Sequence, residues 1–233
     1  MTVVARSVDI DGAFNARVFV SSPRDRPWLL RSSALDALTP SGVAALHDLG
    51  IRRVIDLREP GEGAAASHDI DVVALPVYRF DDGVPEVGRL EEIMERVLES
   101  RGEVLAEIVE AVASADGAVA VHCTIGKDRT GLVVALLLSA AGVPDADIVA
   151  DYALSGAQVY PHRRAHVERI LAERDVGDAE AAEAWRLNVE SPPEVMEHIL
   201  ALLRARGGAA EYLRARGLSA DALAALRAKP ARA

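Results

Sequence analysis

The sequence predicts an α/β fold with a central, mostly parallel sheet flanked by helices and a helical C-terminal part. Two observations lead to this prediction. Short apolar segments alternate with stretches of helical periodicity through the first two thirds of the 233 residues, and strands separated by helices are typical of parallel sheets covered on both faces. Beyond Gly131, helical spacing dominates. We expect a single domain over residues 1–233, with 145–233 as a helical portion or lid.

The first half of the chain supplies the first strands and one helix. A short apolar piece at 28–31 precedes a helix start, where Thr39 suits the N-cap and Pro40 suits the first turn. This helix is expected to end at Gly50. Strands are predicted to follow at 51–57 and 71–77.

Helices dominate the rest of the predicted order. Apolar residues recur with helical spacing over 89–115, where Gly102 is expected to divide two helices. The apolar segment 118–122 is compact enough for a buried strand. The stretches 61–66 and 177–184 are expected to be loops or short helices. Helices are predicted at 131–141, 145–155, 157–174, 193–206, 209–216 and 219–228.

Composition and charge exclude several classes of function. The net charge of −10 argues against nucleic-acid binding, because a polyanion requires a basic surface. No apolar run approaches the roughly 20 residues that span a bilayer, so no stable membrane insertion is expected. The N-terminal segment lacks the apolar core of a secretory signal, which favours a cytoplasmic protein and leaves export without a signal peptide open. The single cysteine excludes an intramolecular disulfide and a cysteine-based zinc site.

That cysteine lies in the most informative segment, VAVHCTIGKDRTGL at 119–132. A buried strand ends at Cys123, a loop contains Gly126, and an apolar helix starts near Arg129. The backbone N–H groups of 124–129 are expected to form an anion-binding nest, to which the helix adds its positive N-terminal end. The same field favours the thiolate form of a cysteine, and the arginine fork matches two phosphate oxygens. The segment therefore predicts a site for phosphate or another oxyanion beside a reactive thiol.

The loop also carries a family resemblance. Cys-x5-Arg followed by Thr is the signature loop (P-loop) of the cysteine-dependent protein-tyrosine phosphatase superfamily, and HCTIGKDRTG at 122–131 resembles a bacterial branch with Lys-Asp before the arginine. The branch carries Asn-Phe-Arg-Asp near its start, whereas this chain has Asn15 followed by Ala, Arg17 and Val. Apart from that departure the likeness covers most of the chain, through 30–39, 49–62, 151–152 and 209–217.

The resemblance implies a phosphatase that hydrolyses phosphate monoesters through a cysteinyl-phosphate intermediate. Its main substrate would be protein phosphotyrosine, with phosphoserine, phosphothreonine or phosphoinositides as further substrates, so phosphoproteins and phospholipids are the expected partners. The implied mechanism requires no metal and no cofactor. Cys123 is the implied nucleophile, Arg129 the phosphate clamp, and Thr130 a hydroxyl that hydrogen-bonds the sulfur. The implied phosphate-binding residues are Thr124, Ile125, Gly126, Lys127, Asp128 and Arg129.

A general acid must protonate the leaving oxygen, and two loops offer candidates for this role. Asp81 and Asp82 follow the strand at 71–77 and should emerge at the same sheet edge as Cys123, although two acids before a glycine are also ordinary turn chemistry. Asp128 is the rival, because it lies inside the signature loop.

Supporting roles are predicted for other polar residues near the loop. His122 is expected to hydrogen-bond the loop backbone and hold it open. Lys127 either adds a cation at the mouth of the pocket, which would widen the substrate class, or is an exposed lysine that tunes the charge of the loop. Asp56 and Arg58 end a strand at the same edge, where a local salt bridge is favoured over catalysis and added positive charge from the arginine is the alternative.

Basic residues gather at 162–169, and three functions other than a phosphatase are also candidates. His162 and His166 stand four residues apart on a predicted helix, where a solvated basic face is favoured over a phosphate-recognition patch or a metal site; the neighbouring cations are Arg163, Arg164 and Arg169. The competing functions are a rhodanese-like sulfurtransferase, an arsenate reductase of the low-molecular-weight type and a catalytically inactive phospho-binding module. The Lys-Asp-Arg-Thr-Gly ending, the position of the cysteine and the intact signature favour the phosphatase over each of them.

Overall fold

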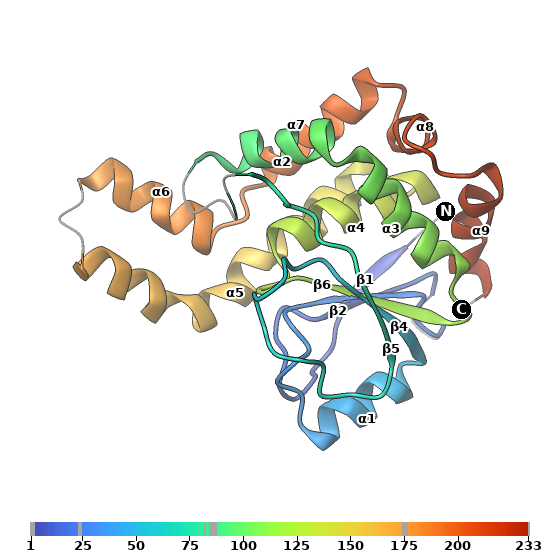
Figure 1. Cartoon of the computed structure of the whole chain (residues 1–233), viewed down its shortest axis with the longest axis horizontal. Helices are drawn as coiled ribbons and strands as arrows, with labels where there is room; N and C mark the ends of the chain where they lie inside the picture. The colour runs from blue at the N-terminus through green and yellow to red at the C-terminus, as the bar shows by residue number, and fades with distance from the viewer. Residues whose placement is uncertain (1–2, 23–24, 82, 84–87, 174–176, 233) are drawn as a thin grey trace.

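The computed structural model describes the chain except for residues 1–2, 23–24, 82, 84–87, 174–176 and 233. Within this described part, a six-stranded sheet in the order β1-β2-β3-β6-β4-β5 forms the centre (Figure 1). The four strands from β3 to β5 in that order are parallel, and β1 and β2 extend the sheet in antiparallel fashion. The predicted class, an α/β fold with a mostly parallel sheet, is confirmed. The strands are β1 (Val4–Ser7), β2 (Arg17–Val20), β3 (Leu29–Ser32), β4 (Ile51–Asp56), β5 (Asp71–Ala74) and β6 (Ala118–His122).

Helices cover both faces of the sheet (Figure 1). Because successive side chains of a strand point to opposite faces, β6 contributes Ala120 to one hydrophobic cluster and Val121 to another. The smaller cluster includes Leu46 of α1 (Pro40–Asp48). The larger one includes residues from α2 (Leu90–Ser100), α3 (Gly102–Ser114), α4 (Asp128–Ala141), α7 (Pro193–Ala205), α8 (Ala209–Arg214) and α9 (Ala220–Arg232).

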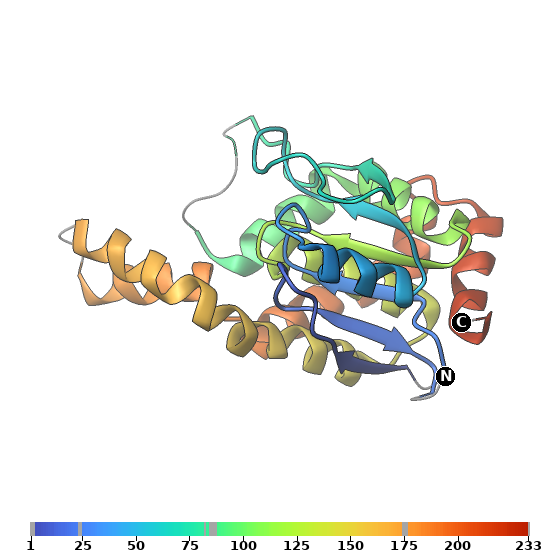
Figure 2. The same cartoon turned by 90° about the horizontal axis from the view of Figure 1, so that it is seen from below.

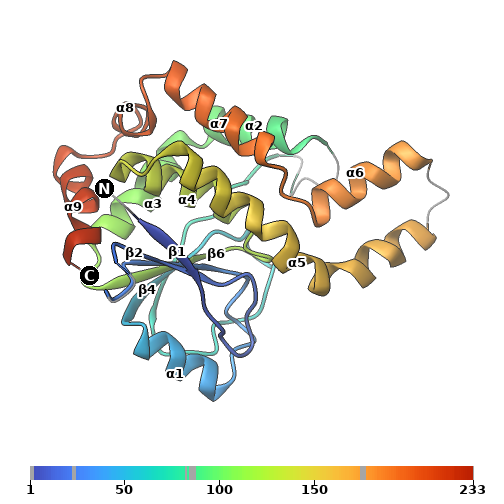
Figure 3. The same ribbon diagram turned by 180° about the vertical axis from the view of Figure 1, so that it is seen from behind.

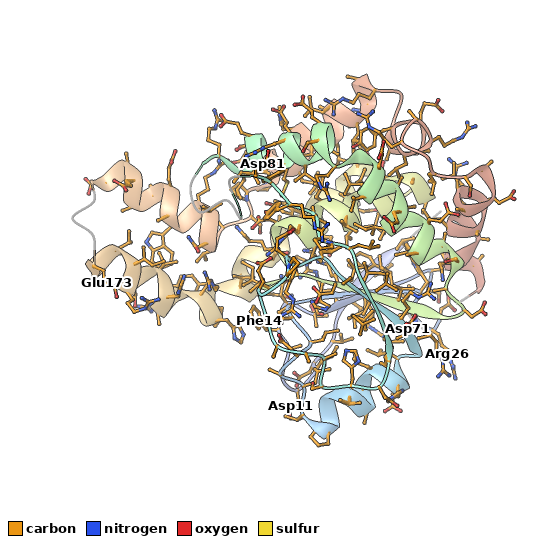
Figure 4. All side chains as sticks on the ribbon, in the orientation of Figure 1. Asp11, Phe14, Arg26, Asp71, Asp81 and Glu173 are labelled. Atoms are coloured by element: carbon orange, nitrogen blue, oxygen red, sulfur yellow. The ribbon has the colours of Figure 1, made fainter. Side chains whose placement is uncertain are left out.

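Two helices extend beyond this body. Figures 2 and 3 show α6 (Asp178–Asn188) and the outer half of α5 (Asp145–Glu173) projecting away from the sheet, and Figure 4 places Glu173 at the far end. We call residues 160–173 and 178–188 the arm. Val167 is a buried residue of the arm, whereas no residue of α6 is buried. Neither α5 nor any other helix in the described part of the chain is long and apolar enough to cross a membrane.

Local differences from the predicted elements have physical reasons. The prediction of two helices at 145–155 and 157–174 is wrong, because α5 continues through Gly156. That glycine lets Ser191 approach the helix closely. Its N–H donates to Ser191 Oγ at 2.6 Å, and a Cβ would lie 3.2 Å from the same oxygen. The strands β1 and β2 were not predicted. The division of α2 from α3 at residue 101 agrees with the expected break at Gly102.

Candidate active site

The carboxyl ends of three parallel strands meet at one edge of the sheet. Ser32 of β3, His122 of β6 and Asp56 of β4 are register partners at this edge. Cys123 follows β6 directly, and residues 123–127, which we call the Cys123 loop, connect the strand to α4. In sheets of this kind ligands bind at the carboxyl edge.

The backbone of the Cys123 loop is held from beneath. Asn15 Nδ2 donates to the carbonyls of Ile125 at 3.1 Å and Gly126 at 2.9 Å, and Arg31 donates to the Gly126 carbonyl at 2.7 Å. Because the N–H and C=O of one peptide point in opposite directions, the N–H groups that follow these carbonyls face away from the support. Gly126 has a φ of 69°, and a Cβ there would lie 2.3 Å from a backbone oxygen of β3, so the loop requires glycine at this point.

A buried ionic cluster lies beneath the loop. Arg17 Nε donates to Asp151 Oδ1 at 2.7 Å, Arg31 pairs with Asp151 Oδ2, and the three side chains are at most 3% exposed. Arg17 also donates to Asn15 Oδ1 at 2.6 Å and to Ser155 Oγ at 2.9 Å. Burial and the neighbouring Arg31 lower the pKa of Arg17 to about 10. Burial acts to raise the pKa of Asp151, but the two guanidinium groups outweigh it and hold that pKa below its ordinary value.

This cluster gives a role to the segment that departs from the family pattern. Asn15 and Arg17 are the two residues that the segment shares with the pattern, and they make the contacts just described. Ala16 and Val18, which differ from it, pack in the smaller hydrophobic cluster. Sequence reasoning left the contribution of this segment open, and the retained asparagine and arginine were the available signal.

Arg129 is fixed by a carboxylate and an aromatic ring. Its NH2 donates to Glu62 Oε1 at 2.7 Å and to Thr124 Oγ1 at 3.2 Å, its NH1 pairs with Glu62 Oε2, and the guanidinium lies 4.7 Å from the ring centroid of Tyr78. Burial acts to lower the pKa of Arg129, but Glu62, Cys123 and Tyr78 together outweigh it and the net direction is upward. Sequence reasoning gave Glu62 no role beyond the resemblance and did not single out Tyr78.

The rival acids are placed very differently. Asp128 begins α4, is nearly enclosed, and has a carboxylate oxygen, Oδ1, that accepts no hydrogen bond from the described residues, with Lys127 Nζ 3.3 Å away as an ion pair. Burial raises the pKa of Asp128 against the opposing charges of Lys127 and Arg129. Asp81 is exposed on the loop before α2, where Figure 4 labels it. Asp82 lies outside the described residues.

The supporting residues lie around the base of the loop. His122 Nδ1 hydrogen-bonds the Cys123 carbonyl at 3.1 Å, and burial lowers the pKa of the imidazole. Thr130 follows Arg129 in α4 and is fully buried, and its Oγ1 has no hydrogen-bond partner among the described residues, so the implied bond to the Cys123 sulfur is not made in this structure. Arg58 donates to Asp56 at 2.8 Å and to Asp36 at 2.7 Å, so the favoured local salt bridge is present.

Lys127 does not lie where an added cation was expected. Its side chain is fully buried, and Nζ contacts backbone carbonyls at the end of α6 rather than the mouth of the pocket. Burial lowers the pKa of Lys127, against the opposing effect of Asp128. The loop lysine is therefore neither an exposed side chain nor a cation that faces substrate.

A cavity of about 420 Å³ joins the loop to the arm. The cavity is lined by Cys123, Asp128 and Arg129, and also by Tyr78. The arm contributes cations, carboxylates and apolar side chains, namely Arg163, His166, Ile170, Glu180, Glu183, Ala184, Leu187 and Asn188. The structure thus brings the predicted nucleophile, clamp and one predicted acid into a single cavity.

The basic residues of α5 separate into two groups. Arg163 and His166 line the cavity, and Arg163 donates to Asn188 Oδ1 at 2.9 Å. Arg164 and Arg169 are exposed and pair along the helix with Glu168 and Glu173. The ring of His162 stacks on Phe14, with 4.0 Å between centroids.

The chain is similar to several known proteins. Residues 9–230 match the model of the tyrosine phosphatase family. The chain is 32% identical over 220 residues to a tyrosine-protein phosphatase of Nostoc commune, covering 86% of this chain and 73% of that protein. It is 32% identical over 251 residues to the triple specificity protein phosphatase PtpB of Mycobacterium tuberculosis, covering 89% and 86%. The crystal structure of TpbA from P. aeruginosa aligns over 97% of this chain and 96% of its own, with 20% identity and a TM-score of 0.30.

Proposed function

The chain belongs to the tyrosine phosphatase family and hydrolyses phosphate monoesters, and we propose that it does so through Cys123 as nucleophile. The observation that carries this assignment is the single cavity lined by Cys123, Asp128 and Arg129. The positive N-terminal end of α4 and the guanidinium of Arg129 would stabilise the negative charge of a phosphate bound beside the sulfur.

The proposed reaction has two steps. In the first, Cys123 Sγ attacks phosphorus in line, the bond to the leaving oxygen breaks, and the protonated carboxyl of Asp128 gives that oxygen its proton. In the second, Asp128 takes a proton from water as the water attacks phosphorus, and the thiolate leaves with release of inorganic phosphate. The buried carboxyl is suited to the first role, because burial raises its pKa and favours the protonated form.

Arg129 is proposed to hold the equatorial phosphate oxygens. A guanidinium has five N–H donors, and Glu62 and Thr124 take three of them among the described residues. The remaining two lie on Nε and NH1, and the anchoring fixes the plane of the guanidinium, so less entropy is lost when phosphate binds. Thr130, adjacent to the clamp, is proposed to stabilise the leaving thiolate in the second step.

Phosphotyrosine is the proposed main substrate. Tyr78, Ile93, Ile170 and Leu187 give the cavity apolar lining, which suits the aromatic ring between phosphate and peptide. Arg163 adds positive charge to the cavity lining, so phosphoinositide headgroups, which carry further phosphates, are a second candidate. The relative in M. tuberculosis is named a triple specificity phosphatase, which supports testing phosphoserine and phosphothreonine as well.

A substrate panel tests this proposal. We expect vanadate-sensitive hydrolysis without added metal, with the highest kcat/KM for a phosphotyrosyl peptide over the same peptide with phosphoserine or phosphothreonine. Arg163→Gln is expected to lower kcat/KM for a soluble phosphoinositide about tenfold, the value of a charged hydrogen bond, with little change for the phosphotyrosyl peptide. Absence of vanadate-sensitive hydrolysis of every substrate would falsify the proposed function.

A pH–rate profile distinguishes the candidate acids. Asp128→Asn is expected to lower kcat for the phosphotyrosyl peptide by about 10²- to 10⁴-fold and to abolish the alkaline limb of the profile, because the wild-type limb records deprotonation of the acid. Its raised pKa shifts that limb upward from the range of an ordinary aspartate. Asp81→Asn is the matched control and should keep both limb and rate. If Asp82→Asn loses the limb while Asp128→Asn retains it, the assignment of the acid is wrong.

A further inference from the structure

The side chain of Lys127 connects the Cys123 loop to the base of the arm. Its Nζ donates to the carbonyls of Arg186 at 3.2 Å, Leu187 at 2.9 Å and Glu190 at 2.6 Å. An amine has only two hydrogens to donate, so three separate acceptors require the ammonium form. The group is fully buried and is not part of the cavity lining. Lys127 therefore cannot offer its charge to substrate in this arrangement.

The three carbonyls belong to the C-terminal end of α6 and the residue two positions beyond it. The last carbonyls of a helix have no partner within the helix and form the negative end of its dipole. A buried ammonium at this point satisfies them and is stabilised by them. Leu187 packs against the larger hydrophobic cluster and Trp185 stacks on Tyr160, but no residue of α6 is buried. Polar contacts at the base of this helix therefore add to a limited packing.

A second contact at the base of the arm joins α6 to α2 and not to the loop. Arg186 donates to both carboxylate oxygens of Glu91 on α2, at 2.6 and 3.0 Å. This pair ties α6 to the body but does not touch the Cys123 loop. Besides the stacking of His162 on Phe14, the arm thus contacts the loop through Lys127 and α2 through Arg186.

The position of Lys127 in the chain makes its contact sensitive to the shape of the loop. It lies between Gly126, whose carbonyl is held by Asn15 and Arg31, and Asp128, where α4 begins. A backbone adjustment of the loop around a phosphate changes the place and direction of the lysine stem, and hence the contacts of its ammonium group. The reverse also holds, because a docked arm restrains the lysine and through it the loop.

We propose that Lys127 is a positioning residue that couples oxyanion binding in the Cys123 loop to docking of the arm, each stabilising the other. The inference rests on the proposed function in one respect, that the loop takes an oxyanion. Because coupling between two binding events is reciprocal, an oxyanion in the loop should protect the base of the arm. The same contact would bring the cavity-lining residues of the arm over the substrate when phosphate is in place.

Hydrogen exchange of the amides in 186–190, with and without orthovanadate, tests the coupling. In the wild-type protein we expect saturating vanadate to slow this exchange about fivefold or more, within the usual range of coupling energies. In Lys127→Met the exchange should be faster, and vanadate should no longer slow it, although vanadate still inhibits because Arg129 and the loop amides remain. Lys127→Arg, which keeps a buried cation with several donors, should retain part of the protection.

Arg186→Met is the matched control, because it loosens the arm without touching the loop. Its exchange should be faster than in the wild type, but the slowing by vanadate should persist. A purely structural lysine would instead change exchange by the same factor with and without vanadate. Equal slowing of the exchange by vanadate in the wild type and in Lys127→Met overturns the inference. So does a wild-type protein in which bound vanadate leaves the exchange of 186–190 unchanged. That last result tests the inference even if Lys127→Met does not fold.

The two levels of failure are distinguishable. If vanadate neither binds nor inhibits the wild-type protein, the proposed function fails and takes the coupling with it. If vanadate inhibits hydrolysis but leaves the arm unchanged, the function stands and the coupling alone is rejected.

Discussion

Cys123→Ser is expected to lower kcat for a phosphotyrosyl peptide by roughly 10⁴-fold or more, the usual cost of removing a covalent nucleophile. Serine places a neutral hydroxyl where the thiolate would attack, and the field of α4 and Arg129 is too weak to ionise it at neutral pH. Steady-state hydrolysis at fixed pH gives the ratio.

Binding should survive this change. The loop amides and Arg129 remain in place in Cys123→Ser, so the variant should bind the phosphotyrosyl peptide at least as tightly as KM suggests for the wild type, as measured by calorimetry. Loss of rate with loss of binding would point to a damaged loop rather than a missing nucleophile. A variant within tenfold of the wild-type rate would show that Cys123 is not the nucleophile.

Asp151→Ala is expected to destabilise the protein by about 3–5 kcal/mol, the cost of leaving buried charges without their partner. Arg17 and Arg31 would then stand next to each other with no carboxylate between them, and both are fully buried. The free energy of unfolding from urea titration measures the loss. Activity should fall as well, because Arg31 also supports the Gly126 carbonyl.

The control lies one turn earlier on the same helix. Asp147 is exposed in the first turn of α5, so Asp147→Ala should cost less than about 1 kcal/mol, the value of a charge at a helix end. The two variants should also differ in acid. The folded pKa of Asp151 lies below its ordinary value, so its stabilisation is present above the unfolded pKa of about 3.9 and is lost as pH falls through the folded pKa. Comparable destabilisation by both variants would argue against the ionic cluster.

The strand, loop and helix around Cys123 could be predicted because their signals are local. An apolar strand, a glycine and an apolar helix follow one another within 119–132, and each has its own propensity. The same locality explains why the break at Gly102 was predicted correctly. Gly156 carried an identical local signal, but its role is set by Ser191, which is distant in sequence.

The long-range polar contacts of the site could not be predicted, because their partners are far apart in the chain. In the sequence, a strand that begins with Arg17 resembles an exposed edge strand. In the structure Arg17 is paired with Asp151, which lies 134 residues later. The sequence alone suggests that Lys127 is a surface cation. In the structure it is covered by the end of α6, about 60 residues later. A buried polar group is satisfied by tertiary partners, and nothing within a short window of sequence identifies those partners.

The lone thiol has a consequence for damage by peroxide. A thiolate is oxidised to a sulfenic acid, which many proteins rescue by forming a disulfide with a second cysteine. These 233 residues contain no second cysteine, so a sulfenic acid on Cys123 can condense only with a backbone nitrogen or with a thiol from another molecule. Without such a thiol, and where no bond to a backbone nitrogen forms, further peroxide oxidises the sulfenic acid to sulfinic and sulfonic acids and the loss is permanent. Recovery from oxidative stress is therefore set by the thiol supply of the surroundings and not by the chain itself.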